Sequence, residues 1–187
     1  MNEKARLRQE LRARRKALDP ATRAAAHEAM SRSLEALLPA GPVALYAGTR
    51  DEADATLALV PDPLWPRVVG VALELVRCPR AELVPGYRGI LEPPPTLAPV
   101  PLAEVAAIVV PGVAFDARGH RLGQGGGHYD RLIARARELA APPLVVALAY
   151  DFQIVSRVPD EAHDQRVDRV VTERRVLETS LDGADGA

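Results

Sequence analysis

The sequence predicts an α/β fold in which an open, mostly parallel sheet carries helices on both faces. Three observations support this. Residues 105–110 (VAAIVV) and 144–150 (LVVALAY) are continuous apolar runs rich in β-branched residues, as in buried parallel strands. Between them, residues 128–140 (HYDRLIARARELA) repeat apolar positions at helical spacing. A strand, a helix and a strand in this order form a parallel crossover, so we expect both strands near the centre of the sheet.

Length and composition favour a single domain over residues 1–187. Hydrophobic residues make up 48% of the 187 residues, enough for one well-buried core and short for two. A net charge of −1 argues against a general role on nucleic acids or membrane surfaces. The single cysteine, Cys78, excludes an internal disulfide framework, and no apolar run approaches a bilayer span. We therefore expect a cytoplasmic monomer that acts on a small molecule.

The segment over residues 3–18 predicts a helix with two distinct stripes. One stripe is apolar and is expected to dock: Leu7, Leu11 and Leu18. The neighbouring stripe is cationic and consists of Lys4, Arg8, Arg12 and Arg15. The residues alone leave two interpretations of the cationic stripe open: a solvated basic face or a nucleic-acid contact. Because no aromatic residues interleave with the cations, the nucleic-acid contact is disfavoured.

The other elements follow from turn signals and apolar runs. Asp19 and Pro20 are an N-cap and a first-turn proline, which predict a helix that ends before Pro39. Further elements are expected as follows: a strand over residues 43–48, a helix starting near 51–54, one or two strands over 67–77, a rigid proline-rich spacer over 93–101 and a last short strand over 167–172.

A glycine-dense loop lies directly before the predicted helix at 128–140. Five glycines fall within residues 119–127, and glycine concentrates where φ must be positive or where another group approaches the backbone. Free N–H groups at such a helix start form an anion site. Arg118 and Arg121 add mobile positive charge, and Asp130 could hold a divalent metal. The loop therefore predicts a metal-bound nucleotide, the alternative being a flexible surface connection.

Residues 111–131 (PGVAFDARGHRLGQGGGHYDR) resemble the signature of the 5-formyltetrahydrofolate cyclo-ligase family, also called methenyltetrahydrofolate synthetase. The family pattern reads roughly PGxxFDxxGxRLGxGxGYYD, and almost every fixed position is met. His128 stands where tyrosine is usual, and Gln124 stands where a basic residue is common. Sparser matches extend the resemblance over nearly the whole chain. It implies a three-layer arrangement similar to the NagB and ribose-phosphate isomerase fold.

The resemblance also implies a role for each matched residue. ATP contacts are implied for a KxxxR pair and the glycine loop: Lys4, Arg8, Arg121, Leu122, Gly123, Gln124, Gly125, Gly126, Gly127, His128 and Tyr129. Three of these are implied to be catalytic: Lys4, Arg121 and Tyr129. Folate contacts are implied for Tyr46, Ala47, Glu52, Glu92, Gln124, His128 and Tyr150, and Mg²⁺ contacts for Asp130 and Asp164. Near Glu52, Ala55 stands where threonine is usual.

The implied reaction is an ATP- and Mg²⁺-dependent cyclisation of 5-formyltetrahydrofolate, with or without a polyglutamate tail, to 5,10-methenyltetrahydrofolate. ADP and phosphate are released. Phosphorylation of the formyl oxygen would let N10 attack the formyl carbon, so positioning and charge neutralisation should dominate catalysis. Two alternatives stay open. One is a non-catalytic nucleotide or anion sensor on the same fold, which the departures at Ala55, Gln124 and His128 would favour. The other is an RNA-binding module, which the acidic remainder of the chain disfavours.

Overall fold

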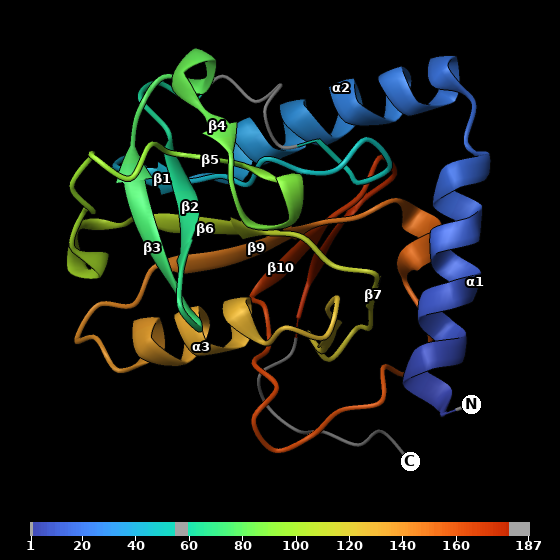
Figure 1. The fold of residues 1–187 in the computed structure, drawn as a ribbon. Helices are drawn as coiled ribbons and strands as arrows, with labels where there is room; N and C mark the ends of the chain where they lie inside the picture. The colour runs from blue at the N-terminus through green and yellow to red at the C-terminus, as the bar shows by residue number, and fades with distance from the viewer. Residues whose placement is uncertain (1, 55–59, 180–187) are drawn as a thin grey trace.

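Seven strands of the described chain form one sheet at the centre of the molecule (Figure 1). The structure, a computed structural model, describes residues 2–54 and 60–179. The strands lie in the order β11-β10-β9-β6-β1-β2-β3, with these bounds: β1 Val43–Ala44, β2 Leu64–Val69, β3 Ala72–Arg77, β6 Ala107–Val110, β9 Leu144–Leu148, β10 Arg169–Val171 and β11 Val176–Glu178. The pairs from β10 to β2 are parallel, and only the edge strands β3 and β11 pair antiparallel. This confirms the predicted fold class and the central place of β6 and β9.

At its two edges, the sheet contains strands that differ from the predicted ones or define them more closely. β10 confirms the strand predicted over residues 167–172, but β11 follows it, so the prediction that it is the last strand is wrong. The chain can reverse there because the Thr172 hydroxyl accepts hydrogen bonds from the amides of Arg174 and Arg175 at 3.2 and 3.0 Å. At the opposite edge, the segment at 67–77 belongs to a hairpin whose turn contains Gly70, with a φ of 61°.

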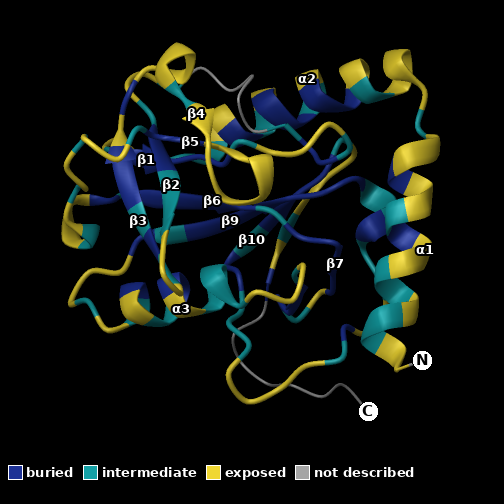
Figure 2. Cartoon of the chain, viewed as in Figure 1, coloured by how far each residue is buried: buried dark blue, intermediate teal, exposed yellow. Residues whose placement is uncertain are grey.

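Helices cover both faces of the sheet, as predicted (Figure 1). These helices are α2 (Pro20–Leu37) on one face and α3 (His128–Arg137) on the other. Successive side chains of β6 alternate between the faces, as strand geometry requires. Val109 packs in a cluster with Met30 of α2, and Val110 packs in a cluster with Ile133 of α3. The strands between the helices are therefore buried on both sides (Figure 2), and each fully buried side chain of this size contributes about 1.5–3 kcal/mol to folding.

A third helix, α1 (Glu3–Ala17), packs on a small hairpin formed by β7 (Ala114–Phe115) and β8 (Arg121–Leu122). Leu7 and Leu11 of α1 lie in one cluster with Leu122. This confirms that the apolar stripe of the helix docks. At the start of α2, the Asp19 carboxylate accepts hydrogen bonds from the amides of Ala21 and Thr22 at 3.0 Å each, which confirms the predicted cap.

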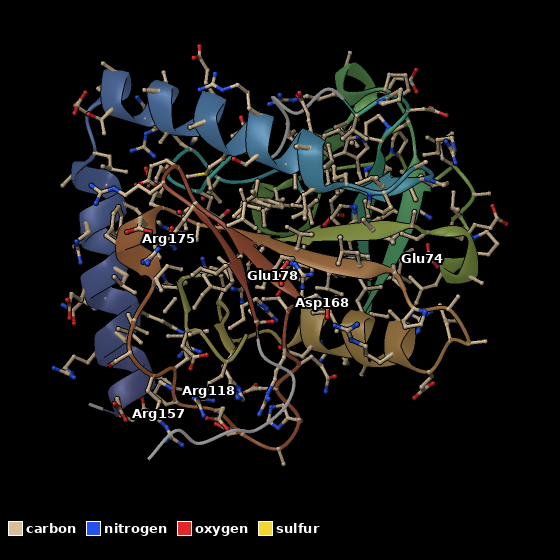
Figure 3. The ribbon with its side chains drawn as sticks, turned by 180° about the vertical axis from the view of Figure 1, so that it is seen from behind. Glu74, Arg118, Arg157, Asp168, Arg175 and Glu178 are labelled. Atoms are coloured by element: carbon tan, nitrogen blue, oxygen red, sulfur yellow. The ribbon has the colours of Figure 1, made fainter. Side chains whose placement is uncertain are left out.

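The β7–β8 hairpin interrupts the crossover between β6 and α3, and the sequence does not predict it. Asp116 holds its turn, because the buried carboxylate accepts from the amides of Arg118 and His120 at 3.0 Å each and from the amide of Val158 at 2.9 Å. The Arg118 guanidinium binds the same carboxylate at 2.8 Å and is labelled in the reverse view (Figure 3). Arg118 is therefore a fixed structural partner of Asp116, and the prediction that it supplies mobile charge at the glycine loop is wrong.

A second small hairpin, β4 (Val84–Pro85) with β5 (Leu91–Glu92), lies near β2 and leads into the proline-rich segment. That segment is bound to β2, since Arg67 donates to the carbonyls of Pro94 and Leu97 at 2.7 and 3.0 Å. The helix expected to start near residues 51–54 falls mostly on residues 55–59, outside the described part. None of the helices within residues 2–54 and 60–179 has both the length and the apolar character that crossing a bilayer requires.

Candidate functional site

A cavity of about 1020 Å³ lies beyond the carboxyl ends of β1 and β6. Tyr46 and Ala47, which follow β1, line it together with Pro111 and Gly112, which follow β6. Open α/β sheets place their ligands at this end of parallel strands. The wall includes most of the residues implied by the sequence: Lys4, Arg8, Tyr46, Ala47, Glu52, Glu92, Arg121, Leu122, Gly123, Gln124, Gly125, Gly126, Gly127, His128, Tyr129, Asp130 and Asp164. Their individual roles stay predictions.

The glycine loop forms the part of this wall between β8 and α3. Gly125 has a φ of 103°, and Gly127 has a φ of 63° at the N-cap of α3, values that favour glycine. No side chain caps the helix start. Within the described chain, the amides of residues 124–127 donate to no protein atom. Several N–H groups therefore lie unpaired at a helix N-terminus beside the cavity, which is the arrangement of an anion site.

The cationic stripe of α1 faces this loop rather than open solvent. The Arg8 Nε donates to the carbonyl of Gly123 at 2.9 Å, and Arg12 donates to the side chain of Gln124. Arg15 is buried, with its guanidinium 3.4 Å from the carbonyl of Gly112. At the start of the helix, Lys4 contacts acidic side chains of the cavity wall. Lys4 and Arg8 line the cavity, and all four cations of the stripe have protein partners, which excludes the interpretation of a solvated basic face for these residues.

Arg121 is held firmly in the wall, contrary to the expectation of a mobile cation. Its guanidinium lies 2.7 Å from the Asp130 carboxylate and 5.8 Å from the centre of the Tyr129 ring. Burial raises the pKa of the Tyr129 phenol well above its usual range, and the charge of Glu52 adds to this effect. Tyr129 is therefore neutral at physiological pH and can act as a hydrogen-bond donor.

The two carboxylates implied as metal ligands, Asp130 and Asp164, already have protein partners. Asp130 accepts from Arg121 and from the amide of Gln165, the latter at 3.3 Å. Asp164 accepts from the Lys4 ammonium at 3.1 Å, and Glu161 accepts from the same ammonium at 2.8 Å. Burial alone would lower the pKa of Lys4, but the hydrogen bonds and charges of Glu161 and Asp164 raise it. Among the described residues, no group of three or more acidic, histidine or cysteine side chains could hold a metal.

The cavity is also lined by acidic and apolar side chains. Glu52 is only 8% exposed, and its carboxylate accepts from the amide of Thr49 at 2.8 Å and from the Gln124 side chain at 3.3 Å. The Arg15 guanidinium lies 3.8 Å from the same carboxylate. Glu92 is also only 8% exposed. The apolar side chains of the wall include Pro66, Val68, Leu73, Tyr87 and Ile90. Ala55 lies outside the described residues.

Tyr150 is the exception among the implied residues, because it does not line the cavity. Its hydroxyl lies 2.8 Å from His27 Nε2 of α2, and its ring stacks on Phe152 with centroids 5.6 Å apart. Tyr150 continues the alternation of Val146 and Leu148, whose side chains pack in the cluster that includes α2. The expectation of a pocket wall at Tyr150 is therefore wrong, because strand geometry turns its side chain under α2.

The cavity also contains residues that the motifs do not indicate. Tyr87 packs edge-on against His128 with ring centroids 5.5 Å apart, and Gln165 and Arg131 line the wall nearby. Burial lowers the pKa of His128, and the charges of Arg131 and Arg88 lower it further. Arg15 does not line the cavity but lies 3.8 Å from Glu52, and because it belongs to the cationic stripe, its spacing was a usable signal. Tyr87 lies in a short 3₁₀ helix, Tyr87–Gly89, and Gln165 in an irregular segment, where no periodicity could have indicated them.

Known proteins provide an independent comparison. A sequence profile described as the 5-formyltetrahydrofolate cyclo-ligase family matches residues 1–173. The 5-formyltetrahydrofolate cyclo-ligase of Escherichia coli K12 is 38% identical over 116 residues, which cover 62% of this chain and 63% of that protein. The one of Mycolicibacterium smegmatis is 38% identical over 94 residues, which cover 50% of this chain and 47% of that protein. The chain therefore spans about half to just under two thirds of the length of these two curated relatives.

Solved structures extend the likeness over the whole chain. The NMR structure of Aquifex aeolicus 5,10-methenyltetrahydrofolate synthetase is 35% identical, with a TM-score of 0.80 and coverage of 98% of both chains. A 5,10-methenyltetrahydrofolate synthetase from Mycoplasma pneumoniae is 19% identical, with a TM-score of 0.71 and coverage of 92% of this chain and 99% of that one, and shares the fold. Because the profile and the Aquifex structure each match nearly the whole sequence, the chain belongs to the 5-formyltetrahydrofolate cyclo-ligase family.

Proposed function

We propose that this chain is an enzyme that cyclises 5-formyltetrahydrofolate to 5,10-methenyltetrahydrofolate at the expense of ATP, with Mg²⁺. The observation that carries the proposal is one cavity lined by two chemically different sets of groups. Unpaired amides and cations form one set, and a buried carboxylate with apolar side chains forms the other. The cavity measures about 1020 Å³, at the upper end of the range of about 300–1,000 Å³ for small-molecule sites.

The glycine loop is the proposed site of the triphosphate. Unpaired amides at the N-terminus of α3 stabilise anionic oxygens through the partial positive charge of the helix end. Lys4 and Arg121 add full positive charges at the same wall. Both are held by carboxylates, and a phosphate oxygen can take over part of that pairing. Arg8 supports the loop, because it binds the carbonyl of Gly123.

The other part of the cavity is the proposed site of the folate. A pterin ring has flat apolar faces and an edge with N–H donors, which a carboxylate accepts in pairs. Glu52 supplies a buried carboxylate, and Tyr46, Val68 and Tyr87 supply apolar surface in the same cavity. Gln124 bonds Glu52 from the glycine loop, at 3.3 Å. The two substrates would therefore meet near Gln124, as transfer from one to the other requires.

The donor chemistry of the wall fits Mg²⁺ bound together with phosphates. Mg²⁺ usually keeps several waters and takes only one or two protein carboxylates in addition to phosphate oxygens. Asp130 and Asp164 line the phosphate part of the cavity and would hold the ion. When bound, the ion would neutralise phosphate charge. No further acidic ligand is needed, in accord with the absence of a larger cluster among the described residues.

The proposed chemistry balances without covalent participation of the protein. The formyl oxygen takes the γ-phosphoryl group, and ADP leaves. The N10 lone pair then attacks the activated formyl carbon, N10 loses its proton, and the carbon–oxygen bond breaks with departure of phosphate. The protein's residues orient the two substrates, exclude water and stabilise the charge on the transferred group. The neutral Tyr129 phenol is suited to donating a hydrogen bond to that group.

The test is the absorbance of 5,10-methenyltetrahydrofolate after the purified protein is mixed with 5-formyltetrahydrofolate. We expect a rise that needs both ATP and Mg²⁺, with stoichiometric release of ADP. A protein that binds ATP in calorimetry and yields no absorbance change would contradict the proposal. It would instead identify a nucleotide sensor on the same fold, and Gln124 and His128 would then be exchanged for the residues usual in the family.

A further inference from the structure

Arg131 joins two loops that form different parts of the cavity wall. Its Nε donates to the carbonyl of Val71, in the turn between β2 and β3, at 2.7 Å. Its Nη2 donates to the carbonyl of Gly126, in the glycine loop, also at 2.7 Å. Both acceptors are backbone oxygens, so the guanidinium acts as a fork between two chain segments.

Arg131 also fixes the next peptide of the glycine loop. Its own backbone N–H donates to the carbonyl of Gly127 at 3.1 Å, as the first hydrogen bond of α3. One residue therefore holds two successive carbonyls, those of Gly126 and Gly127. In a trans peptide the carbonyl and the N–H of the following residue point in opposite directions. The N–H groups of Gly127 and His128 consequently point away from Arg131.

The conformation at this place makes the two N–H groups converge. Gly127 has φ 63° and ψ 11°, in the left-handed region, and His128 begins the right-handed helix. Successive N–H groups in such a pair of conformations form a concave nest for an anion. Gly127 and His128 both line the cavity.

We infer that Arg131 is a positioning residue that holds the Gly127 and His128 amides ready for a phosphate of the nucleotide. Its bond to Val71 ties this nest to the β2–β3 hairpin, whose Val68 and Leu73 line the apolar part of the cavity. The identity of the anion rests on the proposed function. The competing explanation is that Arg131, which lies at the wall itself, binds a phosphate directly as a charge.

The test is calorimetric binding of the Mg²⁺ complex of the non-hydrolysable ATP analogue AMP-PNP to the full chain. Arg131→Ala should raise the Kd about tenfold, the loss expected for one pre-oriented hydrogen bond to a charged group. Arg131→Lys should bind the analogue nearly as weakly as Arg131→Ala does, because a single ammonium cannot hold both carbonyls in the geometry of the guanidinium. Arg135→Ala, an exposed arginine one turn further along α3, is the matched control and should change the Kd less than twofold.

Kinetics separate positioning from a general loss of structure. Arg131→Ala should raise the KM for ATP by a larger factor than the KM for 5-formyltetrahydrofolate. An unchanged Kd in Arg131→Ala, full recovery of affinity in Arg131→Lys or an equal rise of both KM values would each overturn the inference. Wild-type protein that binds the analogue and does not cyclise 5-formyltetrahydrofolate would contradict the proposed function alone, since the binding comparison stays valid.

Discussion

Arg121 and Asp130 stand at the two ends of the glycine loop, and their side chains form an ion pair in which Nη2 lies 2.7 Å from Oδ1. The Arg121 side chain is only 4% exposed and that of Asp130 16%. The pair thereby closes the base of the loop. Asp130, which the sequence indicates as a candidate metal ligand, also compensates a buried cation.

Asp130→Ala should therefore lower the free energy of unfolding as well as turnover. Removing one partner of a buried pair leaves an uncompensated charge, which costs about 3 kcal/mol. Urea denaturation monitored by circular dichroism measures this loss. Asp130→Asn, which keeps a hydrogen-bond acceptor, should lose less stability and still lose most of its activity. Near-normal activity of Asp130→Asn at limiting Mg²⁺ would refute the metal role.

The two lysines of the chain allow a matched comparison. Lys4 lies in the cavity wall between Glu161 and Asp164, and Lys16 is exposed near the end of the same helix. Lys4→Ala should raise the KM for ATP about tenfold or more, because a charge-assisted contact to phosphate is lost. Stability should change by less than about 1 kcal/mol, since the pair is partly exposed. Equal kinetic effects of Lys4→Ala and Lys16→Ala would show that only net charge matters.

Glu52→Gln should weaken folate binding selectively. The substitution keeps the shape of the side chain and removes the charge that a pterin edge would use, so the KM for 5-formyltetrahydrofolate should rise about tenfold. The Kd of AMP-PNP should stay within about twofold. Glu104→Gln, at an exposed site away from the cavity, is the control. A larger effect on the nucleotide than on the folate would place Glu52 with the phosphates and contradict the proposed division of the cavity.

His120 should make the protein less stable in mild acid. Burial lowers its pKa, the charges of Arg118 and Arg166 lower it further, and Asp160 and Asp116 act in the opposite direction. The unfolded chain, with a histidine pKa of about 6.5, then binds the proton more readily than the folded one. Stability is therefore complete above about pH 6.5 and falls as the pH drops through the folded pKa.

Thermal unfolding measured at several pH values between 7.5 and 5.5 tests this prediction, and the melting midpoint should fall as the pH is lowered. Neither ring nitrogen of His120 has a hydrogen-bond partner among residues 2–54 and 60–179, so His120→Leu should fold and should show a smaller fall in melting midpoint across this pH range. Because His27 and His128 have lowered pKa values as well, the melting midpoint of the variant should still fall in acid, by a smaller amount. If the melting midpoints of the wild type and His120→Leu depended on pH in the same way, His120 would be excluded as a cause of the loss of stability in acid.

Tyr150→Phe tests the corrected position of this residue. The change removes the hydroxyl that lies 2.8 Å from His27 Nε2 and should cost about 1 kcal/mol of stability. Because Tyr150 does not line the cavity, the KM for 5-formyltetrahydrofolate should stay unchanged. A clear rise in that KM at unchanged stability would return Tyr150 to the folate site.

Elements with a local signal were predictable, and the shortest ones were not. The helices α1, α2 and α3 and the strands β6 and β9 each carry apolar periodicity or continuous β-branched runs, and all occur where expected. The hairpin β7–β8 and the strand β11 have two or three residues per strand, too few for any period to show. Their formation depends on contacts from distant segments, such as the amide of Val158 on Asp116.

The sequence by itself determined the fold class, the family resemblance and the place of the glycine loop, because glycine content, helix starts and apolar runs are local properties of the chain. Only the tertiary structure decided which way individual side chains face. Tyr150 shares the α2 face with Leu148, whereas the α1 cations turn onto the glycine loop. A helix or strand has the same periodicity whichever side becomes the cavity, so partners 100 or more residues apart, such as Arg8 and Gly123, are set by packing.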